Sequence, residues 1–229
     1  MTTTSWAVII AGGKDEMLNP ETCTAFLNLD NKPILSYSLT AFEHCPEIDG
    51  IIIVAPRDRL EQVVSVVQLF GCHKVRKIVP SGPTQYASLL AGMKYVDEEA
   101  KVIVVHEASR PGLAASDISE QVKLARKNNV VMAGHELSES AVVVGKNAVV
   151  EQYLESGSIW KYGSPTAVNG EFFRAMVETI AKKKKTVKSL LEAIQFAGGT
   201  PRLIKSSRFP LKISTFDQLR NLEPITLPS

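Results

Sequence analysis

The chain has 229 residues and a formal net charge of +2, so its composition gives it no general attraction to nucleic acid or to an anionic membrane. Its apolar fraction of 45% and charged fraction of 22% are typical of a globular protein with a substantial core. Cys23, Cys45 and Cys72 lack the spacing of a zinc site or a disulfide framework. Because the chain shows no signal-peptide pattern and no apolar run long enough to span a bilayer, we expect a cytoplasmic protein.

Short apolar runs alternate along the chain with segments of helical periodicity. Apolar residues at i, i+3, i+4 and i+7, as over 60–67, predict helices between the runs. The alternation indicates an α/β fold with a mostly parallel sheet, and continuous apolar strands fit a sheet covered by helices on both faces. The predicted strands are Ala7–Ile10, Ile51–Val54, Val75–Val79, Val102–Val105 and Val130–Ala133.

A different pattern follows the last of these runs. The segments Ala141–Val144 and Ala148–Leu154 flank Gly145-Lys146-Asn147, which predicts a β-hairpin whose turn has positive φ angles. A two-stranded ribbon is only marginally stable by itself. We therefore expect this arm to pack on the rest of its own chain or on a second subunit.

The remaining segments continue the α/β pattern. They predict helices over 171–183 and 187–197 and short strands over 202–205 and 211–214. Since no internal repeat or linker is present, we interpret residues 1–229 as a single domain with a hairpin arm at about 138–160.

The first predicted strand leads directly into Ala11, Gly12 and Gly13. Glycine allows backbone N–H groups to approach a phosphate closely, so this loop is either a nucleotide cradle or an ordinary strand-to-helix turn. Ligands of open α/β sheets bind beyond the carboxyl ends of the strands. We therefore expect this loop and the residues after Val105 to lie on the same edge of the sheet.

Five further motifs follow this loop, namely 31–35 (NKPIL), 81–88 (SGPTQYAS), 105–111 (VHEASRP), 154–165 and 210–214 (PLKIS). Their order and spacing resemble the 2-C-methyl-D-erythritol 4-phosphate cytidylyltransferases and their ribitol-phosphate relatives over nearly the whole chain. The VHEASRP element is fairly specific when combined with the first strand and its loop, whereas NKPIL recurs across sugar nucleotidyltransferases.

The resemblance implies a Rossmann-like nucleotidyltransferase fold with a β-hairpin arm that reaches across a homodimer. It also implies CTP and Mg²⁺, transfer of CMP to a sugar-alcohol phosphate, and release of pyrophosphate. On the nucleotide side, it implies contacts from small residues and one carboxylate: Ala11, Gly12, Gly13, Gly82, Ser88 and Glu107.

Glu107 stands where the family has a metal-binding aspartate. A carboxylate can bind Mg²⁺, but glutamate is one methylene longer and Mg²⁺ tolerates little distortion of its octahedron. Glu107 is therefore the candidate metal ligand. We interpret His106, which precedes it, as an oriented structural residue rather than a ligand.

On the acceptor side, the resemblance implies phosphate contacts from Arg110, Ser140, Ser164 and Lys212. A structural role in the Arg-Pro turn is the alternative for Arg110. Lys14 is the only cation in the glycine-rich loop. Lys14 and Lys212 are the two candidate catalytic residues. The alternative for Lys14 is an ordinary solvated lysine.

Several of the family's cations are absent. The loop has Glu16-Met17 in place of an arginine, and Cys23-Thr24-Ala25 in place of a proline-lysine-glutamine element. Gln85 and Ser156 each replace an arginine, and Gln85 can hydrogen-bond but cannot neutralise charge. Nor is the family's T-D-E helix start recognisable over 186–189.

Removal of one donor that stabilises a transition state costs about 10²–10³ in rate. The sequence therefore suggests a cytidylyltransferase-family protein whose activity is weak or altered. Two other hypotheses stay open: a binding or regulatory protein that keeps the nucleotide pocket without its chemistry, and an enzyme for a different nucleotide or acceptor.

Overall fold

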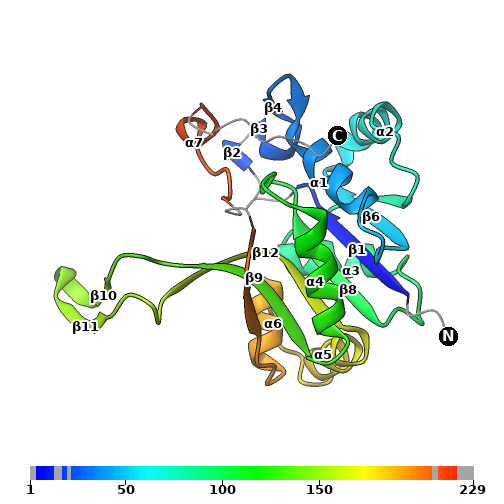
Figure 1. Cartoon of the computed structure of the whole chain (residues 1–229). Coiled ribbons are helices and arrows are strands. Elements are labelled where there is room, and N and C mark those ends of the chain that lie inside the picture. The colour runs from blue at the N-terminus through cyan, green and yellow to red at the C-terminus, as the bar shows by residue number, and fades with distance from the viewer. Residues whose placement is uncertain (1–3, 13–16, 20–21, 208–210, 221–229) are drawn as a thin grey trace.

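Buried β-branched residues form a seven-stranded sheet at the centre of the molecule (Figure 1). The computed structural model describes residues 4–12, 17–19, 22–207 and 211–220. The strands of the sheet are β1 (Ser5–Ile10), β6 (Gly50–Ala55), β7 (Val75–Pro80), β8 (Val102–Glu107), β9 (Val130–Glu136), β12 (Trp160–Asn169) and β13 (Arg202–Lys205). The helices are α1 (Ile34–Glu43), α2 (Leu60–Leu69), α3 (Gln85–Met93), α4 (Ala115–Ala125), α5 (Gly170–Lys182), α6 (Leu190–Phe196) and α7 (Phe216–Arg220).

The order of the strands is β13-β9-β12-β8-β1-β6-β7. Strand β12 runs antiparallel to both of its neighbours, and the other strands run parallel to one another. The expected mostly parallel sheet flanked by helices is therefore confirmed. Two short two-stranded ribbons lie outside this sheet: β2 (Met17–Asn19) with β3 (Thr22–Cys23), and β4 (Asn28–Leu29) with β5 (Lys32–Pro33).

Strand β12 is the one strand of the central sheet that the sequence pattern did not predict. Its sequence contains Gly163 and Pro165, which argue against a strand because proline cannot donate to the ladder. The structure places both residues where the pairing of β12 with β9 shifts register, between Tyr162 and Thr166. The break in the ladder thus accommodates the residues that hid the strand.

Two cores lie on the two faces of the sheet. On one face, α1, α2 and α4 pack on side chains such as Ile9 and Ile53. On the other face, α3, α5 and α6 pack on side chains such as Val8 and Ile10. This alternation explains why the central strands are apolar without interruption, since each successive residue enters one core or the other.

The end of the chain differs from the sequence prediction in two places. Helix α6 begins at Leu190 rather than at 187, because the Ser189 hydroxyl caps it by accepting a hydrogen bond from the Glu192 N–H (3.2 Å). The predicted strand over 211–214 is wrong. Its Ile213 is buried and its N–H donates to the Ser109 carbonyl (3.0 Å), but this segment joins no sheet.

The predicted hairpin is confirmed as β10 (Ala141–Val144) paired with β11 (Val150–Leu154). Its turn has positive φ angles at Asn147 (60°) and Ala148 (57°), whereas Gly145 has a negative φ. The arm leaves the sheet between β9 and β12 and projects well away from it (Figure 1).

None of the helices in the described ranges is both long and apolar enough to cross a membrane.

Candidate active site

The carboxyl end of β8 carries side chains with different environments on the two faces of the sheet. Val105 belongs to the core beneath α3, α5 and α6, and Glu107, two residues further on, faces the same side. His106 lies on the opposite face, where its ring contacts Phe42 of α1 (5.5 Å between ring centroids). His106 therefore points away from the side on which Glu107 acts.

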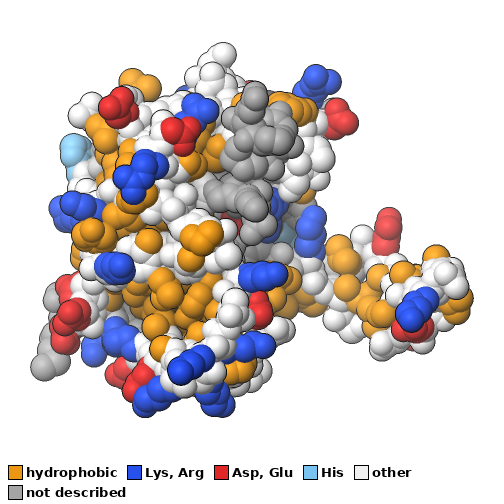
Figure 2. All heavy atoms as spheres, turned by 180° about the vertical axis from the view of Figure 1, so that it is seen from behind, with side chains coloured by type: hydrophobic (Ala, Val, Ile, Leu, Met, Phe, Trp, Pro, Cys, Tyr) orange, Lys and Arg blue, Asp and Glu red, His pale blue; other side chains and the backbone are white. Residues whose placement is uncertain are grey.

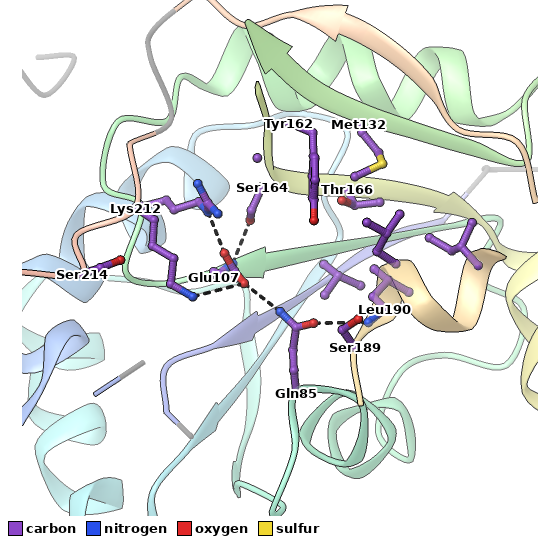
Figure 3. A pocket seen from close by; sticks show the side chains of 15 residues that line it. Gln85, Glu107, Met132, Tyr162, Ser164, Thr166, Ser189, Leu190, Lys212 and Ser214 are labelled. Atoms are coloured by element: carbon purple, nitrogen blue, oxygen red, sulfur yellow. Dashed lines mark hydrogen bonds and ion pairs between the residues drawn. The ribbon is translucent and has the colours of Figure 1, made fainter. Parts of the chain in front are cut away.

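A cavity of about 600 Å³ lies between this face of the sheet and α6 (Figure 3). Its floor includes Val105, Thr166 and Met132, which are paired side by side across β8, β12 and β9. Its other lining residues are Gln85, Glu107, Arg110, Tyr162, Gly163, Ser164, Ser189, Leu190, Leu191, Ile194, Lys212 and Ser214.

The carboxylate of Glu107 is the polar centre of the cavity. Arg110 Nε lies 2.6 Å from one of its oxygens, and Lys212 Nζ lies 3.6 Å from the other. The side chain of Glu107 is only 14% exposed. Figure 3 shows Lys212 and Gln85 converging on this carboxylate from different elements. The structure thus brings together three of the predicted site residues from two distant parts of the chain.

The charges around Glu107 determine its protonation. Burial by itself raises the pKa of this carboxyl group, but the neighbouring Arg110 and Lys212 outweigh burial and hold the pKa below the ordinary glutamate value. Glu107 is therefore ionised at neutral pH and neutralises part of the charge of both cations.

Gln85 connects this carboxylate to helix α6. Its side-chain amide donates to Glu107 Oε1 (2.7 Å), and its carbonyl oxygen accepts from the Leu190 N–H (3.2 Å) at the start of α6. Gln85 is thus oriented by one donor and one acceptor. It occupies the position where the resemblance led us to look for an arginine, and it supplies a hydrogen bond there instead of a charge.

His106 and Ser164 support Glu107 from the other side. The His106 ring is fully buried between the Ser38 hydroxyl (2.8 Å from Nε2) and the Ser164 hydroxyl (2.7 Å from Nδ1). The Glu107 N–H also donates to Ser164 Oγ (2.8 Å). Burial lowers the pKa of His106 to about 3, so its ring is neutral. The structural interpretation of His106 is supported, and Ser164 both lines the cavity and orients the end of β8.

Lys212 is positioned by the residue that follows it. The side chain of Ile213 is buried in a small cluster with Leu29, Ile34 and Tyr37, and its backbone is bound to Ser109. This anchor holds the segment beside the end of β8. The side chain of Lys212 itself stays 23% exposed, so its ammonium group is accessible from the cavity.

The predicted nucleotide side lies at the neighbouring strand end. Ala11 and Gly12 follow β1, and Ile10 is paired with Glu107, so the loop and the end of β8 share one edge as expected. A Cβ atom on Gly12 would lie 2.2 Å from Pro56 Cδ, so a residue with a side chain would collide with Pro56 at this position. Gly13 and the predicted catalytic Lys14 lie outside the described residues.

Gly82 and Ser88 hold one another at the start of α3. The Gly82 N–H donates to the Ser88 hydroxyl (3.0 Å), and that hydroxyl is 3.3 Å from the Gly82 carbonyl. A Cβ atom on Gly82 would collide with Ala87 (2.8 Å to its Cβ). Ser88 is fully buried, so its hydroxyl shapes this turn. Neither residue is among those described as lining the cavity.

Ser140, predicted to bind the acceptor phosphate, is not brought to the cavity within one chain. It lies within the arm, directly before β10, where the Tyr153 hydroxyl donates to its Oγ (2.8 Å). A role for Ser140 at a phosphate therefore requires the arm of one copy to reach the cavity of another.

Glu107 is the only carboxylate among the described residues that line the cavity. The described part of the chain holds no group of three or more histidine, cysteine, aspartate or glutamate residues arranged to bind a metal. Mg²⁺ is commonly bound by one or two carboxylates together with substrate phosphates. Glu107 fits this mode only if a metal exchanges with its present partners.

Sequence reasoning missed most of the cavity wall. Met132, Leu191 and Ile194 had the periodicity of core residues, and that signal alone does not separate a core wall from a cavity wall. Gln85 was recognised only as a lost charge. The sequence pattern did not show where β12 lies or where α6 begins, and these two elements form much of the cavity wall.

The arrangement of the sheet and its helices is that of the Rossmann-like α/β nucleotidyltransferase fold. A solved structure named as a 4-diphosphocytidyl-2C-methyl-D-erythritol synthase from Anaerococcus prevotii superposes with a TM-score of 0.82 at 18% identity, covering 95% of this chain and 93% of that one. A 2-C-methyl-D-erythritol 4-phosphate cytidylyltransferase structure from Francisella tularensis gives a TM-score of 0.69 at 21% identity, over 95% and 97% of the two chains.

The family profile of 2-C-methyl-D-erythritol 4-phosphate cytidylyltransferase (IspD) matches residues 5–226, and the chain belongs to this family. A relative of that name from Clostridium botulinum (strain Langeland) is 25% identical over 212 residues, which is 93% of each chain. The resemblance inferred from the sequence motifs is therefore confirmed.

Because the pKa of His106 is about 3 in the folded chain and 6.5 is its ordinary value, the unfolded chain binds a proton that the folded chain does not between these pH values. Stability should therefore fall as pH drops from 6.5 towards 3, by about 1.4 kcal/mol per pH unit. When the free energy of unfolding is measured in urea across this pH range, the His106→Asn variant should lack this contribution to its pH dependence. His73→Asn, which replaces an exposed histidine, should keep it. Equal slopes in all three proteins would contradict the assignment.

Glu107→Gln should lower the free energy of unfolding at pH 7 by about 2–4 kcal/mol, because it leaves two partly buried cations without their anion. The folded-state pKa of Glu107 is depressed, so its contribution is present above the ordinary glutamate pKa and is lost as pH falls through the lower folded value. The stability gap between wild type and variant should accordingly close in acid. Glu98→Gln, on the surface, serves as the control.

Proposed function

We propose that this chain transfers CMP from CTP to a sugar-alcohol phosphate such as 2-C-methyl-D-erythritol 4-phosphate and releases pyrophosphate. The observation that carries the proposal is the convergence of Arg110 and Lys212 on Glu107 at the end of β8. This cluster lies beside the end of β1, where the glycine-containing loop begins. Family membership and the names of the relatives agree with this reaction.

In this reaction an oxygen of the acceptor phosphate attacks the α-phosphorus of CTP. One phosphorus–oxygen bond forms, and the bond to the bridging oxygen of the pyrophosphate breaks. Negative charge increases on the oxygens around the phosphorus, so cations and aligned donors lower the barrier. Arg110 and Lys212 supply the positive charge on the acceptor side.

The ion pairs around Glu107 make the site ready for an anion. The two cations and one carboxylate carry a formal net charge of +1, and each cation already has a fixed direction. When an acceptor phosphate enters, it takes over Arg110 and Lys212 as partners, which frees the carboxylate of Glu107. Mg²⁺, when bound, would be held by Glu107 with phosphate oxygens of CTP and would neutralise charge that develops there.

The loop after β1 completes the nucleotide side of the proposal. Ala11 and Gly12 are held against β6, with the Ala11 N–H donating to Val54 (2.7 Å). Gly13 and Lys14 follow these residues in the sequence, and we assign these two residues to the CTP phosphates. Gly82 and Ser88 shape the turn that would face the base.

A second function is favoured by one observation. Arg110 and Lys212 are the only cations among the described residues that line the cavity, and both are already paired with Glu107. A cavity with so little unpaired charge also suits a nucleotide-binding or regulatory protein that has lost turnover. The two functions are separated by pyrophosphate release.

The arm supports a homodimer. Six apolar side chains on or beside this two-stranded ribbon are 41–62% exposed, and Figure 2 shows hydrophobic side chains over its surface. They are Val142, Val143, Val144, Val149, Val150 and Tyr153. Because an isolated ribbon with such a surface is marginal, we propose that the arm packs on a second copy of this chain.

Purified protein with Mg²⁺, CTP and 2-C-methyl-D-erythritol 4-phosphate should release pyrophosphate. Lys212→Ala should reduce kcat/KM by about 10²–10³, because it removes one cation from the reacting phosphate. Lys127→Ala, which removes an exposed lysine from another part of the surface, should change it by less than twofold. A coupled pyrophosphate assay measures all three proteins.

Calorimetric titration with CTP decides between the two functions if no pyrophosphate appears. CTP binding without release from any acceptor would establish the nucleotide-binding function. Absence of both would reject both.

Light scattering should give the mass of a dimer of the 25.0 kDa chain at micromolar concentration. Val144→Asp combined with Val150→Asp should give a monomer, because charges replace exposed apolar side chains on the arm. Leu69→Asp, an equally apolar residue that is 77% exposed on α2, should leave the dimer intact. A monomeric wild-type chain would overturn the proposal.

A further inference from the structure

The cavity beside Glu107 has two ends of different chemistry. Strand residues two apart face the same side and lie about 7 Å from one another. Glu107 on β8 and Ser164 on β12 form a polar pair at the mouth, joined by the Glu107 N–H and the Ser164 hydroxyl (2.8 Å). One step inward, Val105 and Thr166 are directly paired, and Met132 extends the row onto β9.

Helix α6 covers this inner row with apolar side chains. It begins at Leu190, and Leu190, Leu191 and Ile194 all line the cavity. Leu190 and Ile194 are 6% and 0% exposed, and Val105 and Met132 are 4% and 5% exposed, so they form a fixed wall. Figure 3 shows Leu190, Thr166 and Met132 on the side of the cavity away from Lys212.

Few polar groups remain for a ligand at the inner end. The Ser189 oxygen already accepts from the Glu192 N–H as the helix cap (3.2 Å). The Gln85 side chain already donates to Glu107 through its nitrogen and accepts from the Leu190 N–H through its oxygen. Thr166 contributes a single hydroxyl in the middle of the apolar row, and the hydroxyl of Tyr162, a residue that is 51% exposed, lies beside it (Figure 3). A ligand with several buried hydroxyl groups would leave some without partners, which is unfavourable.

The size of the cavity allows a ligand to use both ends. Its volume of about 600 Å³ is within the range of sites for ligands larger than a phosphate group. A phosphate at Arg110 and Lys212 therefore leaves the inner end for the carbon skeleton to which that phosphate is attached.

From these observations we infer that the cavity selects an alcohol monophosphate whose carbon skeleton carries an apolar portion, in preference to a fully hydroxylated polyol phosphate of the same length. The phosphate lies at Arg110 and Lys212, and the hydrocarbon lies between the Val105–Thr166–Met132 row and α6. This inference rests on the proposed function, because it names the class of acceptor for the same cavity.

The test compares ligands that differ only in hydroxyl groups. Calorimetric titration of the nucleotide-free full chain with n-butyl phosphate and with erythritol 4-phosphate uses four carbons in each case. We expect n-butyl phosphate to bind at least tenfold more tightly. In the series ethyl, butyl and hexyl phosphate, affinity should rise by up to about fourfold per methylene until the inner end is filled.

Two near-isosteric variants test the location. Leu191→Asn places a polar group in the wall and should reduce the affinity for hexyl phosphate at least fivefold, with less than a twofold change for ethyl phosphate. Thr166→Val makes the row fully apolar and should tighten binding of hexyl phosphate. Leu69→Asn, on the exposed surface of α2, should change neither affinity.

Tighter binding of erythritol 4-phosphate than of n-butyl phosphate, or equal affinity for all three alkyl phosphates, would overturn the inference. The inference would also be overturned if affinity rose with alkyl chain length to the same extent in Leu191→Asn as in the wild type. Failure of this inference is distinct from failure of the proposed function. Pyrophosphate release with 2-C-methyl-D-erythritol 4-phosphate is measured separately and does not depend on the binding of alkyl phosphates.

Discussion

The ion pair between Arg110 Nε and Glu107, at 2.6 Å, is the contact on which the cavity depends. It joins the last residue of β8 to the turn that follows, and Lys212 adds a second cation from a segment that is remote in sequence. Gln85 extends the same network to the start of α6. Because a buried carboxylate needs such partners, this one residue holds three separate elements around a shared space.

The same network shows what Gln85 contributes at the start of α3. An arginine at position 85 would bring a third positive charge to Glu107, whereas Gln85 supplies a neutral donor and also accepts from the Leu190 N–H. At position 85 the cavity is therefore organised by two hydrogen bonds and not by a third charge. Its inner end is correspondingly apolar, with Val105 and Ile194 almost fully buried. The network of hydrogen bonds ends at the Leu190 N–H, and the apolar wall of the cavity begins at the side chain of the same residue.

The sequence predicted the strands that are apolar throughout, and it also predicted the hairpin. It did not predict β12, because Gly163 and Pro165 interrupt the pattern at a shift in register. For the site, the motif at 105–111 led directly to Glu107 and Arg110. Ser88, which its motif assigns to the nucleotide side, is buried against Gly82 and shapes a turn, and its place beside a nucleotide stays a prediction.

By itself, the sequence determined the α/β class, the family and the residues that can carry charge, because these follow from periodicity and from short motifs. Only the tertiary structure decided which charges meet. Arg110 and Lys212 are 102 positions apart, and they share Glu107 because Ile213 is buried beside the end of β8. The tertiary structure also decided that Leu191 faces a cavity, since an apolar side chain has the same pattern on a core wall and on a ligand site.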